Sequence, residues 1–248
     1  MKKIKLILYI ILILAISSGC INIKNKATKF EKKEMAPDSL QDISKSLQDI
    51  LNNLDTIEQI QDGTYIVEES EKGTKETKKE EKLTEEKEET EEEKDKKVKQ
   101  EILKKSWEKI DKEIEQLHRK WNEYQGEGLK KGVTTEKIDK LTDSLNLLTK
   151  SIENKKVKDI INYSSQSMLN TAAYFQLYKD EIRGEANKIK HAAYQSYLNG
   201  IEGKNEEAAQ FLTNVEEETN KIRLKLKKDD SKIKILDKVG ISLEDMKK

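Results

Sequence analysis

The sequence predicts an all-α protein, an antiparallel helical bundle that follows a lipoprotein leader, a short heptad helix and a charged stalk. Two observations support this fold class. Over most of residues 98–248, apolar residues recur every three or four positions, the spacing of an amphipathic helix rather than of a strand. Short connections containing Gly or Asn separate these stretches, and proline occurs only once in the chain. Helices joined by short connections pack as antiparallel neighbours.

Residues 1–19 have the order of a bacterial lipoprotein signal peptide. Basic residues near the N-terminus precede an apolar run from Leu6 to Ile16, which is shorter than the about 20 residues that span a bilayer. Small residues then lead to Cys20, the only cysteine. We expect cleavage before Cys20 and lipid attachment at its sulfur, whereas an uncleaved signal anchor is the alternative. With Cys20 used in this way, neither a disulfide nor a thiolate metal site is available.

The mature chain is expected to begin with a lipidated, lysine-rich tether, residues 20–37, that ends at Pro37. Residues 38–62 then show the strongest periodicity of the chain. The apolar positions of this heptad helix are Leu40, Ile43, Leu47, Ile50, Leu54 and Ile57. Such a stripe requires a partner helix, either in the same chain or in a second copy that would form a homodimer through residues 40–57.

Residues 63–97 are expected to form a disordered Glu/Lys-rich stalk. Within residues 68–97, Leu83 is the only apolar side chain, too little to offset the cost of ordering the backbone, roughly 1–2 kcal/mol per residue. The interleaved Glu and Lys residues could also support a marginal helix. Thr64 to Val67 is a short candidate for an extended segment.

A bundle domain is expected over residues 98–248. Its first helix should end at Gly126, Gly128 and Gly132, the second should begin at Thr134 or Thr135, and a third should run from Val157 to Ile182, with Gly184 as a kink or stop. A further helix should start near Asn205 and carry Ala208, Leu212, Val215 and Ile222. Near the C-terminus, Gly240 is the expected stop, and Ser242 with Asp245 the expected capping box.

The composition argues against nucleic-acid binding and against catalysis. The 48 basic and 48 acidic residues cancel, and arginine is scarce, so neither a positive field nor bidentate base recognition is indicated. His118 and His191 lack partners at metal-ligand spacing and are expected to be ordinary surface residues. No catalytic residue, metal or cofactor is predicted, and we expect the protein not to be an enzyme.

Aromatic and basic residues give the candidate partner-binding positions. Tyrosines concentrate between residues 163 and 197, and tyrosine is enriched in interface hot spots. Phe175 and Tyr197 fit the inward stripe, whereas Tyr174 and Tyr194 fall off it and are the better interface candidates. Arg119 and Lys120 precede Trp121 and form a basic candidate for an acidic partner or a sulfated glycan, although a solvated face is the simpler interpretation of such lysine-rich sites.

The leader, Cys20, the tether, the stalk and the terminal bundle together resemble the surface lipoproteins of Borrelia spirochaetes, in which a lipid-attachment motif such as Ile16-Ser-Ser-Gly-Cys20 is usual. This resemblance implies lipid anchoring in the cell outer membrane, surface exposure as an antigen, and binding of host extracellular-matrix, serum or complement proteins. A lipoprotein that faces the periplasm and self-associates through residues 40–57 is the alternative.

Overall fold

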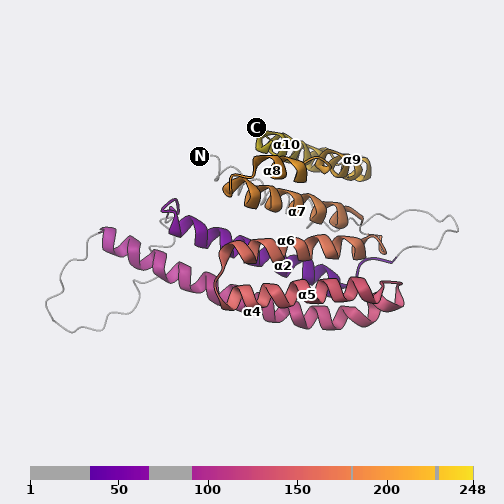
Figure 1. The fold of residues 1–248 in the computed structure, drawn as a ribbon, viewed down its shortest axis with the longest axis horizontal. Helices are drawn as coiled ribbons and strands as arrows, with labels where there is room; N and C mark the ends of the chain where they lie inside the picture. The colour runs from indigo at the N-terminus through magenta and orange to yellow at the C-terminus, as the bar shows by residue number, and fades with distance from the viewer. Residues whose placement is uncertain (1–33, 67–90, 180, 227–228, 248) are drawn as a thin grey trace.

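The computed structural model describes residues 34–66, 91–179, 181–226 and 229–247 (Figure 1). The helices are α2 (Asp38–Gln61), α4 (Glu91–Lys130), α5 (Thr135–Glu153), α6 (Val157–Phe175), α7 (Glu181–Ile201), α8 (Asn205–Phe211), α9 (Val215–Leu226) and α10 (Asp230–Met246). Within these ranges there is no strand, Thr64 to Ile66 included. The predicted all-α bundle is confirmed, whereas the signal peptide, Cys20 and residues 67–90 lie outside the described residues.

Helix α2 packs inside the bundle of its own chain. All six apolar positions of its heptad stripe are buried in the same hydrophobic cluster as Ile110, Leu117 and Trp121 of α4. The two helices are antiparallel, with Lys120 Nζ 3.5 Å from an Asp42 carboxylate oxygen. Each fully buried Leu or Ile stabilises the fold by about 1.5–3 kcal/mol. The partner of the stripe is therefore α4 of the same chain, and the face that a 40–57 homodimer would use is covered.

The expected boundary between the stalk and the bundle domain, at residues 97 and 98, is wrong. Helix α4 begins at Glu91, so residues 91–97 belong to a helix and the domain does not start at residue 98. Helices α2 and α4, which flank residues 67–90, belong to one core, and α2 ends at the same end of the bundle at which α4 begins (Figure 1). The segment between Gln61 and Glu91 therefore joins two helices of one bundle.

The turn between α4 and α5 shows which glycines end a helix. Helix α4 continues through Gly126 and Gly128, contrary to expectation, because a glycine inside a helix costs only about 1 kcal/mol and packing elsewhere offsets it. Gly132 has a φ of +91°, a conformation that favours glycine, and follows the end of the helix. The Thr134 side chain accepts a hydrogen bond from the Lys137 backbone N–H, so α5 begins at Thr135 as predicted.

Helices α6 and α7 are two helices where one was expected. The break lies between Phe175 and Glu181, and Gly184 is inside α7 rather than at a kink or stop. A Cβ atom at Gly184 would lie 3.0 Å from the Ala172 backbone oxygen of α6. The glycine therefore allows the two helices to pack closely.

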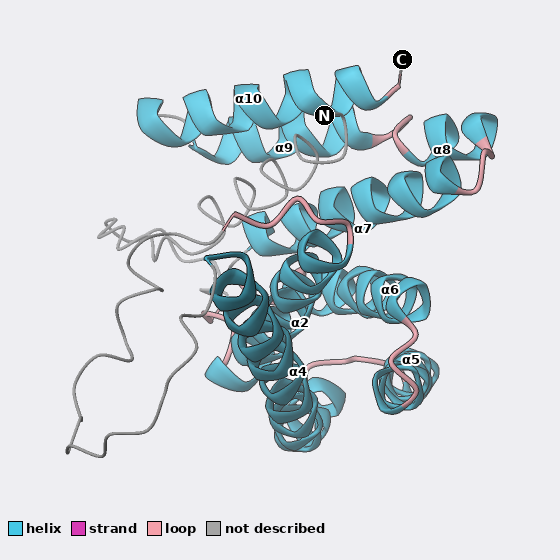
Figure 2. Cartoon of the chain, turned by 90° about the vertical axis from the view of Figure 1, so that its left-hand side faces the viewer, coloured by secondary structure: helices cyan, strands magenta, loops and turns pink. Residues whose placement is uncertain are grey.

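The C-terminal helices form a further layer on α7. Figure 2 shows α8, α9 and α10 on the side of α7 that faces away from α6. Ala186, Ile189 and Ala193 of α7 belong to a second cluster with apolar residues of α9, of α10 and of the turn between α8 and α9, among them Leu212, Val215, Ile222, Leu236 and Val239.

Three expectations for this C-terminal layer are wrong. The helix expected from Asn205 is split into α8 and α9. Helix α10 runs through Gly240, where no atom lies within 4 Å of an added Cβ. The Ser242 hydroxyl donates to the Lys238 carbonyl at 2.7 Å within the helix, so it does not form the expected N-cap.

Candidate functional site

The two tyrosines expected at an interface are buried in the core. Tyr174 is 1% exposed; its ring stacks on Trp121 at 5.9 Å, and its hydroxyl donates to the Lys137 carbonyl at 2.6 Å. Tyr194 is 8% exposed and belongs to the hydrophobic cluster that contains the buried stripe of α2. Burial raises the pKa of both phenols above the ordinary value. Neither side chain is available to a partner, so this expectation is wrong.

The basic candidate does not form a positive surface. Arg119 is exposed, but the Lys120 ammonium lies 3.0 Å from a Glu123 carboxylate oxygen and 3.5 Å from Asp42. The hydrogen bond with Glu123 raises the pKa of Lys120. Because two carboxylates surround this lysine, an acidic partner would gain little there. Cys20, the predicted lipid-attachment residue, lies outside the described residues.

Both histidines are half-buried rather than on the surface as expected. His118 Nε2 lies 2.7 Å from the Thr149 hydroxyl oxygen, and that hydroxyl donates to the Leu145 carbonyl, so the imidazole is the donor. His191 Nδ1 donates to the Ser165 carbonyl at 3.1 Å. Burial lowers the pKa of both imidazoles. Among the described residues, no group of three or more His, Cys, Asp or Glu could hold a metal ion.

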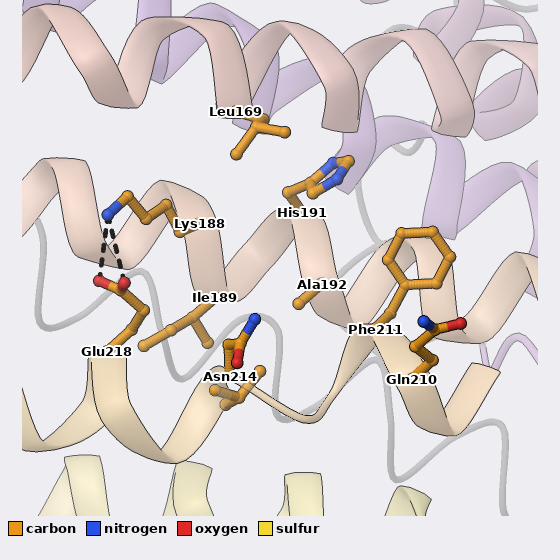
Figure 3. Close-up of a pocket in the computed structure, with 10 residues that line it drawn as sticks. Leu169, Lys188, Ile189, His191, Ala192, Gln210, Phe211, Asn214 and Glu218 are labelled. Atoms are coloured by element: carbon orange, nitrogen blue, oxygen red, sulfur yellow. Dashed lines mark hydrogen bonds and ion pairs between the residues drawn. The ribbon is translucent and has the colours of Figure 1, made fainter. Parts of the chain in front are cut away.

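A shallow groove of about 280 Å³ lies between α7 and the α8–α9 segment. Figure 3 shows its lining, with Leu169 of α6 above and Phe211 of α8 at one end. The His191 and Phe211 rings meet edge to face, with centroids 6.1 Å apart. At the other end the Lys188 ammonium lies 3.2 and 3.3 Å from the two Glu218 carboxylate oxygens, so this pair neutralises itself. The groove offers apolar contact and has no free charge among these groups.

A buried polar layer on α7 was missed by the sequence reasoning. Lys190 is 2% exposed, and burial lowers its pKa to about 8 although nearby Asp49 of α2 favours the charged form. Next to it, the Asn187 amide donates to Thr171 at 3.1 Å and to Ser44 at 3.2 Å. Helical spacing places Asn187, Lys190 and Tyr194 on one face of α7. This spacing is the only sign in the sequence that the Lys190 side chain points into the protein.

No helix in the described part of the chain is both long enough and apolar enough to cross a membrane. Comparison with protein-family models, with curated proteins and with solved structures found no match.

Proposed function

We propose that this chain is a lipid-anchored outer-membrane protein, attached through Cys20, that presents a helical bundle to macromolecules outside the cell. The observation that carries the proposal is the order of the leader: basic residues, an apolar run and small residues that end at the only cysteine. Such an anchor holds the protein at a bilayer without a membrane-spanning helix, because two or more acyl chains together bind almost irreversibly.

The structure adds two supporting facts. Residues 34–37 already belong to the fold, since Ala36 is buried in the main cluster and the Glu34 carbonyl accepts from the Lys179 backbone N–H at 2.8 Å. Residue 34, fourteen positions after Cys20, is therefore already part of the bundle. A highly charged head joined to its anchor by a short tether suits display and contact with partners, the role that the resemblance to spirochaete surface lipoproteins implies.

Lipid attachment is tested by isolating the native protein from its membrane and measuring its mass, with a Cys20→Ala variant beside it. We expect the wild-type chain to lack residues 1–19, to carry acyl chains such as palmitate, and to partition into detergent. Cys20→Ala should stay unprocessed and unlipidated, while Ser18→Ala, which keeps a small residue before the cysteine, should behave as wild type. A native chain with a free thiol and an intact leader would overturn the proposal.

Surface display is tested by treating intact cells with a protease. The charged, exposed helix ends offer cleavage sites, so the protein should be lost while a periplasmic marker survives. Protection until the outer membrane is broken would instead favour the periplasm-facing alternative.

Host binding is tested by capture from serum and extracellular matrix with residues 34–248 as bait, because a bait without α2 would expose the apolar face of α4. Phe211 is 38% exposed in the groove, and Leu224 is 67% exposed on α9 outside the groove lining. If the groove takes part, Phe211→Ser should weaken capture and the matched control Leu224→Ser should not. Equal capture by both variants and wild type would place the contact elsewhere on the bundle.

A further inference from the structure

The chain enters the bundle at a fixed point at one end. Glu34 forms an ion pair with Lys131, which follows α4, and its carbonyl accepts from the backbone N–H of Lys179, which follows α6. Ala36 is buried, and its carbonyl accepts from the Gln41 side chain at 2.6 Å. Residue 34 is therefore attached to the α4–α5 and α6–α7 connections at the same time, and its position on the bundle is set.

This end of the bundle is opposite the end at which α2 stops. Figure 1 shows that α2 starts beside the α4–α5 and α6–α7 connections, and that it ends toward the opposite end of the bundle, where the α5–α6 connection lies. The 24 residues of α2 and the 40 residues of α4 correspond to lengths of about 36 and 60 Å. Residues 20–33 could span at most about 50 Å if fully extended. This reach exceeds the length of α2, so the tether alone does not orient the bundle, and the surface around residue 34 must do so.

The surface around this point has the composition of a membrane-interfacial site. We call it the anchor-side surface; it consists of the exposed residues Met35, Leu129, Lys130, Lys131 and Lys179. Met35 is 51% exposed and Leu129 is 49% exposed, so two large apolar side chains meet solvent among lysines. Long basic side chains beside exposed apolar ones favour the boundary between headgroups and acyl chains, and lysines are attracted to anionic lipids.

Three carboxylates near the anchor-side surface have hydrogen-bond or ion-pair partners, whereas Asp38 at the start of α2 is exposed. Glu34 is paired with Lys131, Glu127 accepts from the Tyr178 hydroxyl at 3.1 Å, and Glu136 lies 2.7 Å from the Lys140 ammonium. Lysines therefore compensate the charges of Glu34 and Glu136, and Lys130 and Lys179 are exposed at the same end.

We infer that the anchor-side surface rests on the lipid headgroups of the membrane that holds Cys20, so that the bundle stands with the α5–α6 connection directed away from the bilayer. This inference rests on the proposed lipid anchor. It assigns a partner, an anionic lipid surface, to one end of the molecule, and it leaves the opposite end as the part that reaches farthest from the membrane.

The test uses the full lipidated protein in phosphatidylcholine vesicles with and without phosphatidylglycerol. A single thiol is introduced by Thr135→Cys or by Glu153→Cys, two exposed positions at opposite ends of α5 that lie about 27 Å apart. Each thiol carries a donor fluorophore, and the vesicles carry an acceptor on their headgroups. We expect a much larger loss of donor emission from position 135 than from position 153, and a larger difference when phosphatidylglycerol is present.

Charge reversal then tests the lysines. Lys130→Glu with Lys179→Glu should reduce energy transfer from position 135 in phosphatidylglycerol vesicles, whereas Lys155→Glu with Lys156→Glu, at the opposite end, should not. Equal transfer from the two ends, or greater transfer from position 153, would overturn the orientation. An unchanged signal in the Lys130 and Lys179 variant would overturn the role of these lysines.

The wild-type protein separates this inference from the proposed function. Its only cysteine should not react with the fluorophore, because a lipidated sulfur is a thioether. Labelling of the wild-type chain would disprove the anchor itself. An unlabelled wild-type chain with equal transfer from the two ends would disprove only the orientation.

Discussion

Lys190 shows how a single charged side chain shapes the packing of α7. The Lys190 side chain is buried on the same face of α7 as Asn187, whose amide donates hydrogen bonds to Thr171 and Ser44. The acidic group that favours the charged form of Lys190 is Asp49. Burial and the nearby Glu113 carboxylate raise the pKa of Asp49, and Lys45 lowers it. A buried charge that is incompletely compensated lowers stability, and it can be retained because it fixes one register between helices.

Replacing Lys190 by methionine should stabilise the protein. At pH 7 the variant avoids desolvation of the ammonium, and we expect the free energy of unfolding to rise by about 1–2 kcal/mol. The folded-state pKa is depressed to about 8 from 10.5, so the stability of the wild type should increase as pH rises from about 8 to above 10.5 and should change little below 8, where Lys190 is protonated in both states. Lys190→Met should lose this dependence. Denaturant unfolding at pH 7 and pH 10 measures both, with exposed Lys238→Met as control; a less stable Lys190→Met at pH 7 would contradict the argument.

Asp55 on α2 is a second group that opposes folding at neutral pH. Burial raises its pKa to about 6, and one of its oxygens, Oδ1, is buried without a hydrogen-bond partner, while Oδ2 accepts from Gln59. A raised carboxyl pKa stabilises the fold below about pH 4 and loses that contribution as pH rises through 6.

Asp55→Asn should therefore raise the melting temperature at pH 7. The amide oxygen can still accept from Gln59, and we expect a gain of about 1 kcal/mol, a value reduced for the partial exposure of the group. The gain should vanish at pH 4, where the wild-type carboxyl is protonated. Thermal unfolding at the two pH values measures this; an equal gain at both would point to a cause other than ionisation.

At the scale of elements, α7 combines two kinds of interface. One face meets α6 with the polar residues described above, and another meets α8–α10 through small apolar residues such as Ala186 and Ala193. The close approach to α6 depends on Gly184, because only 3.0 Å separates its ideal Cβ position from the Ala172 oxygen. Gly200 lies in the last turn of the same helix, and nothing lies within 4 Å of its Cβ position.

These two glycines give a matched pair of substitutions. Gly184→Ala should destabilise the protein by about 1–3 kcal/mol, because the backbone of α6 must shift. Gly200→Ala should be neutral or stabilise it by up to about 1 kcal/mol, because alanine favours a helix. Denaturant unfolding of both variants measures the difference. A stabilising Gly184→Ala would show that α6 and α7 can separate without cost.

The same elements explain what the sequence could predict. The apolar stripes of α2, α4 and α5 could be predicted because each of these helices buries one narrow face. A repeat of apolar residues every three or four positions is enough to identify such a face. Tyr174 and Tyr194 were misplaced because α6 and α7 are covered from more than one side, so that residues off the stripe also turn inward (Figure 2). Gly240 does not end α10 as expected, because the free-energy cost of a glycine inside a helix is smaller than the stabilisation that the buried Leu236, Val239 and Leu243 provide.

At the scale of the whole molecule, α2 is part of the core although a long charged stretch separates it from α4 in sequence. Periodicity alone left its partner open, since fewer than three heptads do not identify the helix that covers them. The candidate binding site was predicted less well than the fold, because exposure depends on which helices meet. The leader remains the main functional signal of the chain, and Cys20 stays a prediction.

A fragment of residues 98–248 should therefore fold poorly, although its composition suggests a complete bundle. Loss of α2 uncovers Ile110, Ile114 and Leu117, whereas residues 34–248 retain their cover. We expect residues 34–248 to unfold cooperatively and the shorter fragment to aggregate or to lack a cooperative transition, measured by circular dichroism during thermal unfolding. Adding a peptide of residues 34–66 should restore order in the fragment. A shorter fragment as stable as the longer one would contradict the role of α2.

The attachment of residues 34–37 also determines how the protein withstands mechanical load. If the membrane pulls on the N-terminus, tension acts along the axis of α2, which is held on its flank by antiparallel α4. The force then shears α2 along α4, so that the contacts of its buried leucines and isoleucines must break at the same time and not one after another. Rupture under such tension is governed by the unfolding rate. In a chain anchored at its N-terminus, this geometry makes the whole α2–α4 interface, rather than one turn of helix, the element that resists the load.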